Sequence, residues 1–119
     1  MGINIKDIVN NTEVYAKEIS AKYKCITVLK THRTVICNGE NTFINQHGNS
    51  ALAKAGSGDV LAGIIAGLLA QKMNLFEASK LGVYLHSRAG EIASENLTEY
   101  SVLASDIIKH LPLAIKEIL

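Results

Sequence analysis

Residues 48–63 read Gly-Asn-Ser-Ala-Leu-Ala-Lys-Ala-Gly-Ser-Gly-Asp-Val-Leu-Ala-Gly, a run of small residues that leads directly into an apolar segment. The apolar segment, Val60 to Ala70, consists of strong helix formers interrupted by only two glycines, and we expect a helix there. The glycine-rich loop therefore lies at a helix N-terminus, where unpaired N–H groups and the helix dipole both favour an anion.

Gly56 and Gly58 give this loop its expected chemistry. Neither has a Cβ atom, and glycine can adopt positive φ, so the N–H groups from Gly56 to Asp59 can converge on one point. We expect an anion-binding loop. Its sequence has neither the Gly-Lys-Ser/Thr of a Walker A motif nor the spacing of the dinucleotide-binding fingerprint.

Asp59 allows two interpretations. A carboxylate in the first turn of a helix is a common cap in any globular protein. A simple cap, however, needs no loop built for close approach, and here two glycines and Ser57 come immediately before the aspartate. Beside a bound phosphate, the same carboxylate would remove a proton from an attacking hydroxyl group.

The composition limits the function classes. The chain has 119 residues, 48% of them hydrophobic, which is enough to bury one ordinary core. Twelve basic and eleven acidic residues leave a net charge of +1 without a basic block, so we expect no nucleic-acid binding. The most apolar run, Val60 to Ala70, is well short of the roughly 20 residues of a membrane span.

The cysteines and the first residues favour a cytoplasmic protein. Cys25 and Cys37 lack metal-site spacing, and we expect both to be buried free thiols in a reducing compartment. Residues 1–6 do not show the basic and then apolar pattern of a secretory signal.

The first part of the chain reads as a helix and three strands. Residues 5–22 have apolar side chains at helical spacing, and three short β-branched runs follow at 25–29, 34–37 and 42–45. We expect the first two or three strands to form a mainly parallel sheet, with the third strand paired as a hairpin across the turn at 38–41.

The last part of the chain reads as consecutive helices. A helix with core spacing is expected from Asn74 through Ile92, and it contains His86, which we interpret as a core histidine. Ser105 is a candidate N-cap for a final helix that continues to Leu119, and Pro112 predicts a kink or a restart within that helix.

Lys30 is a second candidate for function. It follows the first predicted strand, and ligand crevices in open α/β sheets lie beyond the carboxyl ends of strands. From position alone, a solvated strand end explains this lysine equally well.

Several of these motifs resemble one known family. They are Gly48-Asn49, Leu52-Ala53, the run from Gly56 to Gln71, and His86 with Ala89-Gly90. Together they resemble the C-terminal portion of the NAD(P)H-hydrate dehydratases of the ribokinase-like superfamily, from about Ile5 onward. The fold implied is α/β, the latter part of a ribokinase-like layered fold, in which a short mainly parallel sheet with a β-hairpin is covered by consecutive helices. Residues 1–119 would then be a single α/β unit, a partial domain without its N-terminal part.

The resemblance also implies an activity and a site. The reaction is the ADP- or ATP-dependent dehydration of hydrated NADH or NADPH, with Mg²⁺ accompanying the nucleotide and no dedicated protein metal site. Asp59 would be the catalytic residue. The other implied residues are Gly56, Ser57 and Gly58 in the anion hole, Lys30, Thr31, His32, Arg33, Thr34 and Gly58 at the nucleotide, and Asn49 with Asp59 at the substrate.

Two alternatives stay open from the residues. One is a small-molecule kinase of the same superfamily that phosphorylates a sugar, thiazole or pyrimidine alcohol without elimination. The other is a non-catalytic nucleotide-binding fragment. In each case a small sheet with an open edge predicts pairing, either as a homo-oligomer or with the missing N-terminal portion.

Overall fold

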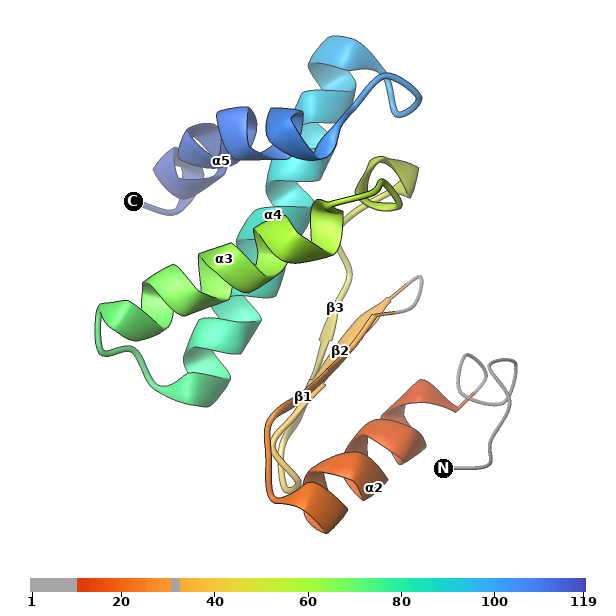
Figure 1. The fold of residues 1–119 in the computed structure, drawn as a ribbon, viewed down its shortest axis with the longest axis vertical. Coiled ribbons are helices and arrows are strands. Elements are labelled where there is room, and N and C mark those ends of the chain that lie inside the picture. The colour runs from red at the N-terminus through yellow and green to blue at the C-terminus, as the bar shows by residue number, and fades with distance from the viewer. Residues whose placement is uncertain (1–10, 31–32) are drawn as a thin grey trace. The chain divides into compact units, whose positions relative to one another are not determined.

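The computed structural model describes residues 11–30 and 33–119, and Figure 1 shows its elements. Contacts between Cα atoms divide the chain into two compact units, residues 1–46 and residues 47–119, each of which we describe by itself. Each unit has its own cluster of buried hydrophobic side chains. The expectation that residues 1–119 form one partial domain stays a prediction.

In the first unit, one helix packs against a three-stranded sheet (Figure 1). Helix α2 (Thr12–Tyr23) contacts strands β1 (Thr27–Leu29) and β2 (Thr34–Cys37), and strand β3 (Thr42–Asn45) completes the order β1-β2-β3. The core of this unit consists of Ala16, Val35 and Cys37, with Ile44 packed against them.

Both strand pairs are antiparallel, so the expectation of a mainly parallel sheet is wrong for the described strands. Val28 pairs with Ile36, and Ile36 pairs in turn with Phe43. The reason is the length of the connections, because only residues 30–33 and 38–41 separate consecutive strands, whereas a parallel pair needs a crossover of about a dozen residues. The hairpin expected between the last two strands is confirmed.

The boundaries in this unit differ from the predicted ones. Residues 5–10 of the predicted helix lie outside the described residues, and the helix ends at Tyr23 because Lys24 adopts a left-handed φ of 51°. Strand β1 begins at Thr27 and not at Cys25. Both cysteines are free, as expected, but only Cys37 is buried; Cys25 is exposed.

The second unit is helical and contains the glycine-rich loop. A short 3-10 helix η1 (Ser50–Leu52) precedes α3 (Ser57–Ala70), α4 (Leu75–Leu97) and α5 (Ala104–Ile118). Helix α4 contacts both α3 and α5 (Figure 1). The core residues are Ala51, Leu85, Ala89, Ile92, Ala93, Val102, Ile107 and Ala114. None of the described helices combines the length and the apolar character that a membrane span requires.

Local contacts fix where α3 and α4 begin. Helix α3 starts at Ser57 and not at Val60, immediately after Gly56. Helix α4 starts after Asn74, whose Oδ1 atom accepts hydrogen bonds from the amides of Phe76 and Glu77 at 2.9 and 3.2 Å.

Helix α5 corrects two further expectations. Ser105 is not the N-cap, because the helix begins at Ala104 after Leu103, and the Asp106 carboxylate accepts a hydrogen bond from the Leu103 amide at 2.9 Å. The helix continues through Pro112, which excludes the restart, while the kink expected as the alternative stays a prediction. Proline has no N–H, and the usual helical hydrogen bond from this position is absent.

Candidate functional site

Gly56 makes the turn from the loop into α3. Its φ of +86° and ψ of −9° lie in the left-handed region that glycine adopts without strain. Gly58, by contrast, is not among the glycines with positive φ, so Gly56 alone in this loop uses the freedom expected of both. A Cβ atom built on Gly58 would meet no atom of the described residues within 4 Å. The space beside Gly58 is therefore open to a ligand.

Amide groups around the start of α3 are available to an anion. The Ser57 N–H is already used, since it donates to the Lys54 carbonyl oxygen at 3.0 Å. The N–H groups of Gly56, Gly58 and Asp59 have no backbone acceptor among the described residues. Unpaired N–H groups at a helix N-terminus form an anion-binding site.

The Asp59 side chain is exposed and lies in the first turn of α3, where the helix dipole favours a carboxylate. The capping and the catalytic interpretation of this residue both stay predictions. Within the described part of the chain, the carboxylate makes no hydrogen bond or ion pair. It is therefore available to accept a proton.

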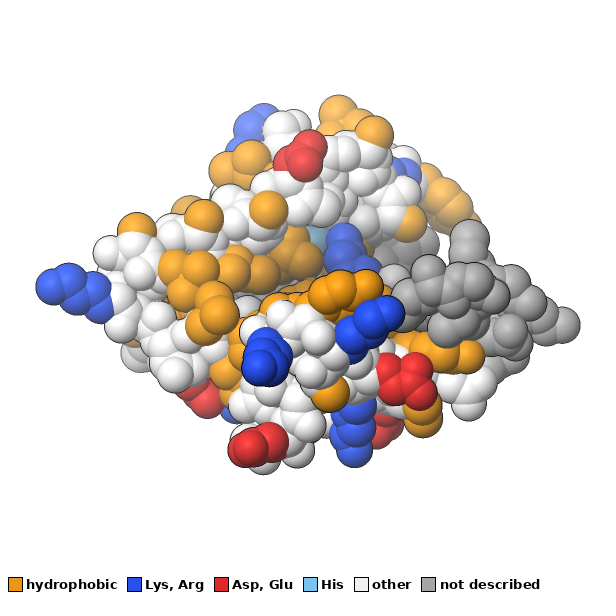
Figure 2. All heavy atoms as spheres, turned by 60° about the horizontal axis from the view of Figure 1, so that its bottom comes forward, with side chains coloured by type: hydrophobic (Ala, Val, Ile, Leu, Met, Phe, Trp, Pro, Cys, Tyr) orange, Lys and Arg blue, Asp and Glu red, His pale blue; other side chains and the backbone are white. Residues whose placement is uncertain are grey.

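Asp59 also lines a groove in the second unit. The groove has a volume of about 590 Å³ and lies among α3, α4 and α5. Asp59 and Gln71 are its polar lining residues, and the others are Val60, Gly63, Ile64, Gly67, Leu68, Leu85, Ile108, Leu111 and Ile115. Hydrophobic side chains also gather on the face of the molecule drawn in Figure 2. A mostly apolar groove with a few polar groups is typical of a binding site.

Behind the loop, Ser57 contacts a buried histidine of α4. Ser57 and His86 are 1% and 2% exposed. The Nε2 atom of His86 lies 3.0 Å from the Ser57 Oγ atom and 3.0 Å from the Ser57 carbonyl oxygen. The interpretation of His86 as a core histidine is confirmed by its burial, but its contact with the loop was not predicted.

The Leu52 side chain packs against two glycines, Gly48 and Gly90, and leaves no room for a Cβ atom at either position. A Cβ atom on Gly48 would lie 2.7 Å from Cδ1 of Leu52, and one on Gly90 would lie 2.6 Å from Cδ2 of the same side chain. Gly48 also has a backbone φ of +111°, a value that residues other than glycine rarely adopt. These contacts pack η1 closely against α4 and so anchor the segment that precedes the loop.

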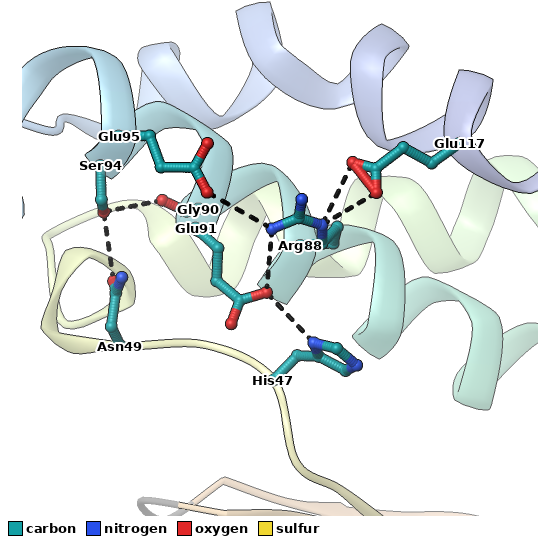
Figure 3. Close-up of polar contacts among 8 residues, drawn as sticks. All are labelled: His47, Asn49, Arg88, Gly90, Glu91, Ser94, Glu95 and Glu117. Carbon is teal, nitrogen blue, oxygen red and sulfur yellow. Dashed lines mark hydrogen bonds and ion pairs between the residues drawn. The ribbon is translucent and has the colours of Figure 1, made fainter.

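Asn49, a predicted substrate residue, has a structural role in the second unit. Its Oδ1 atom accepts a hydrogen bond from the Ala51 amide at 2.9 Å, which caps η1, and another from the Ser94 hydroxyl at 3.3 Å (Figure 3). The contact with substrate stays a prediction.

A polar network beside Asn49 fastens α5 to α4 (Figure 3). Arg88 Nε donates to both carboxylate oxygens of Glu117, at 3.1 and 3.0 Å, and Arg88 Nη1 lies 3.5 Å from Glu91. The hydrogen bond to Glu117 is the main cause that raises the pKa of Arg88 above its usual value. Glu91 also contacts His47 Nδ1 at 3.1 Å. The sequence could have suggested Arg88 with Glu91, which are three residues apart on one helix, but not the partner on α5.

Of the six residues predicted to bind the nucleotide, Gly58 lies in the second unit and the other five lie in the first unit. Lys30 and Arg33 are exposed, and Thr34 is the half-buried first residue of β2. Thr31 and His32 lie outside the described residues. All five belong to a different unit from the glycine-rich loop, and their role stays a prediction.

Comparisons with known proteins agree with the motifs. A Bifunctional NAD(P)H-hydrate repair enzyme Nnr from Vibrio cholerae is 35% identical over 93% of this chain and 22% of its own length. An ADP-dependent (S)-NAD(P)H-hydrate dehydratase from Enterococcus faecalis is 43% identical over 82% of this chain and 33% of its own length. The chain therefore spans about a fifth to a third of these relatives.

Solved structures give the same result. An ADP/ATP-dependent NAD(P)H-hydrate dehydratase from Bacillus subtilis, co-crystallized with ATP/Mg²⁺ and soaked with CoA, matches 100% of this chain and 44% of its own chain, with a TM-score of 0.95 and 32% identity. A ribokinase-like superfamily protein from Enterococcus faecalis matches with a TM-score of 0.77 and 39% identity, over 90% of this chain and 37% of its own. The family model for NAD(P)H-hydrate dehydratase matches residues 1–113. The chain therefore belongs to the NAD(P)H-hydrate dehydratase family.

Proposed function

We propose that this chain supplies the anion-binding loop and the catalytic carboxylate for nucleotide-dependent dehydration of hydrated NADH or NADPH, a metabolite repair reaction. The observation that carries the proposal is the carboxylate of Asp59 beside the amides of Gly58 and Asp59, for which the described residues supply no partner, at a mostly apolar groove. The names of the Enterococcus faecalis and Bacillus subtilis relatives support the choice of substrate.

In this proposal Asp59 accepts the proton of the hydroxyl group on the hydrated nicotinamide ring. The hydroxyl oxygen then forms a bond to the terminal phosphorus atom of ADP or ATP, and the bond between that phosphorus atom and the bridging oxygen breaks, which releases AMP or ADP. The amides of Gly56, Gly58 and Asp59 stabilise the negative charge that develops on the phosphoryl oxygens. Phosphate finally leaves with the electrons of the C–O bond, and loss of a proton from the neighbouring ring carbon forms the double bond of NADH.

The same proposal assigns the adenine nucleotide to Lys30, Thr31, His32, Arg33 and Thr34, together with the Gly56–Gly58 loop. Mg²⁺ would neutralise charge on the phosphates. Among the described residues, however, no three His, Cys, Asp or Glu side chains are grouped to hold a metal ion. In the proposal the ion is held by phosphates and water, and no step above depends on it.

We also propose a protein partner and a cytoplasmic location. The groove among α3, α4 and α5 is apolar, and Ile108 on its wall is 55% exposed. Such a surface favours contact with further polypeptide, either a second copy of this chain or the part of the relatives' sequence that the match does not span. The free thiols of Cys25 and Cys37 fit a reducing compartment.

The test is an assay of NADH formation from hydrated NADH with ADP or ATP, run across a range of protein concentrations. Asp59→Asn should lower turnover by about a hundredfold to ten-thousandfold, the usual effect of removing a general base. Its nucleotide affinity, measured by calorimetry, should stay within a few-fold, because amides and not the carboxylate hold the phosphate.

Glu77→Gln is the matched control, since Glu77 is also an exposed carboxylate in the first turn of a helix, where it pairs with Lys80 at 3.3 Å. It should keep normal turnover. Accumulation of a phosphorylated alcohol without NADH, followed by ³¹P NMR, would indicate a kinase instead. Full activity in Asp59→Asn would remove the catalytic assignment.

A further inference from the structure

We infer that His86 is a positioning residue for the anion-binding loop: its Nε2–H holds the Ser57 carbonyl group and thereby aims the Gly58 amide at the phosphoryl group. The inference rests on the function proposed above for the loop. It concerns a buried side chain that is not among the residues lining the groove, and that the mechanism leaves without a role.

The proton of His86 is located by its contacts. The Nε2 atom lies 3.0 Å from the Ser57 carbonyl oxygen, and a carbonyl oxygen can only accept a hydrogen bond. Nε2 therefore carries the hydrogen and donates it. The Ser57 Oγ atom, also 3.0 Å away, is placed to accept from the same N–H, so its own hydroxyl proton is not needed for this contact.

This contact adds to the helix geometry that orients the next amide. The carbonyl of Ser57 and the N–H of Gly58 belong to one planar trans peptide, in which they point in opposite directions. Since His86 holds the carbonyl on the side of α4, the Gly58 N–H is directed away from α4. A Cβ atom on Gly58 would meet no described atom within 4 Å, so the region around this residue is open to an anion.

The neighbouring peptide is held as well. The Ser57 amide donates to the Lys54 carbonyl at 3.0 Å, and the Val60 amide donates to the Gly56 carbonyl at 3.1 Å. With the contact from His86, three hydrogen bonds hold the start of α3. The unpaired N–H groups are those that the anion would use, and a displacement of about 1 Å in such a constellation can cost about a hundredfold in rate.

A purely structural role for His86 makes a different prediction. Any polar side chain that fits the buried position and finds a partner would then serve equally well. The positioning role instead requires a donor at the place of Nε2. Glutamine can put its amide nitrogen near that place, whereas the shorter asparagine side chain cannot reach it. His86→Gln and His86→Asn therefore separate the two roles with similar chemistry.

The experiment compares the wild-type chain, His86→Gln and His86→Asn, after thermal unfolding has shown that each variant is folded. The ¹H–¹⁵N signals of Gly58 and Asp59 are recorded without ligand and during titration with ADP and Mg²⁺, and turnover of hydrated NADH is measured in parallel. We expect the Gln variant to keep the wild-type signals and to bind ADP within threefold of wild type. The Asn variant should shift both signals and bind ADP about tenfold more weakly, with kcat reduced more than KM is raised.

The outcomes are distinguishable. Equal behaviour of the Gln and Asn variants, whether both resemble wild type or both are impaired, would overturn the positioning role. If one variant does not fold, the ligand-free signals of the other decide, because retained signals in Asn or shifted signals in Gln would also overturn it. If the wild-type chain neither binds ADP nor forms NADH, the proposed function fails, while the ligand-free signals still report whether His86 orients the loop.

Discussion

Gly82 of α4 and Ile65 of α3 lie so close that a Cβ atom built on Gly82 would be 2.6 Å from Cγ1 of Ile65. Real Cβ atoms do not approach so near, and Cγ1 of a β-branched side chain in a helix cannot move away freely. The close approach of α3 to α4 therefore depends on a glycine at this position. Because α3 carries the anion-binding loop at its N-terminus, the same contact supports the site.

We predict that Gly82→Ala destabilises the protein, although alanine is the better helix former. The higher helix propensity of alanine alone would raise the free energy of unfolding by about 1 kcal/mol, but overpacking typically lowers it by about 1–3 kcal/mol. The control is Gly67→Ala in α3, where a Cβ atom would meet no described atom within 4 Å, and this change should stabilise the protein. Denaturant unfolding of both variants checks the prediction; a higher midpoint for Gly82→Ala would contradict it.

We predict that Gly58→Val weakens ADP binding by tenfold or more without a comparable loss of stability. The new side chain has room in the ligand-free protein, since the region around Gly58 is open, but it would occupy the space through which phosphate approaches the amides. Ala62→Val, at an exposed position on the same helix, is the control and should bind normally. Unchanged affinity of Gly58→Val in calorimetry would show that the anion binds elsewhere.

The sequence predicted the elements of this fold better than their pairing. The hairpin between β2 and β3 was identifiable from turn residues such as Asn38, whose Oδ1 atom accepts hydrogen bonds from the Glu40 and Asn41 amides at 2.9 and 2.6 Å. Strands rich in β-branched residues, however, occur in both parallel and antiparallel sheets, so their composition does not define the direction of pairing. The short connections between the strands are the better signal, because they exclude a parallel pair. Pro112 is a similar case, because packing of α5 maintains a helix that local propensity would interrupt.

At the candidate site, the sequence located the loop and Asp59 but not the groups that hold them. Local patterns describe which residues share a helix, and they predicted Gly56, Gly58 and the helix N-terminus. They do not describe contacts such as that of His86 with Ser57, which are 29 residues apart. Such contacts follow from the packing of α4 against α3, which the sequence alone does not define.

We predict that the Arg88–Glu117 pair contributes little to the free energy of unfolding, and that this contribution does not change with pH near neutrality. The hydrogen bond to Glu117 raises the pKa of Arg88, so the contribution from its charge is present below the usual arginine pKa and is lost only in strong alkali. The Glu117 side chain is 41% exposed, and a double-mutant cycle with Arg88→Met and Glu117→Gln should give about 0.2–1 kcal/mol.

The salt dependence of the coupling energy shows whether the charges of Arg88 and Glu117, or the packing of their side chains, join the two helices. High salt should reduce the coupling between Arg88 and Glu117, because both side chains are partly exposed to solvent. The exposed pair of Lys80 with Glu77 on α4 is the reference and should show a coupling no larger than this one. A coupling that 1 M salt leaves unchanged would mean that packing of the arginine stem, and not charge, joins α5 to α4.

We predict that the α5 side of the groove among α3, α4 and α5, and not the side that Asp59 lines, mediates self-association. Its walls are mostly apolar, and Ile108 on the α5 side is 55% exposed, so a second copy can bury it. Ile108→Lys places a charge in that contact and should keep the protein monomeric at concentrations where wild type associates. Leu113→Lys is the matched control: Leu113 is 47% exposed on the same helix but does not line the groove, and the variant should associate as wild type does. Light scattering across a concentration series measures the mass of each. A wild-type chain that is monomeric throughout would exclude the second copy as the partner of this groove, whereas equal association of both variants would place the contact on another surface.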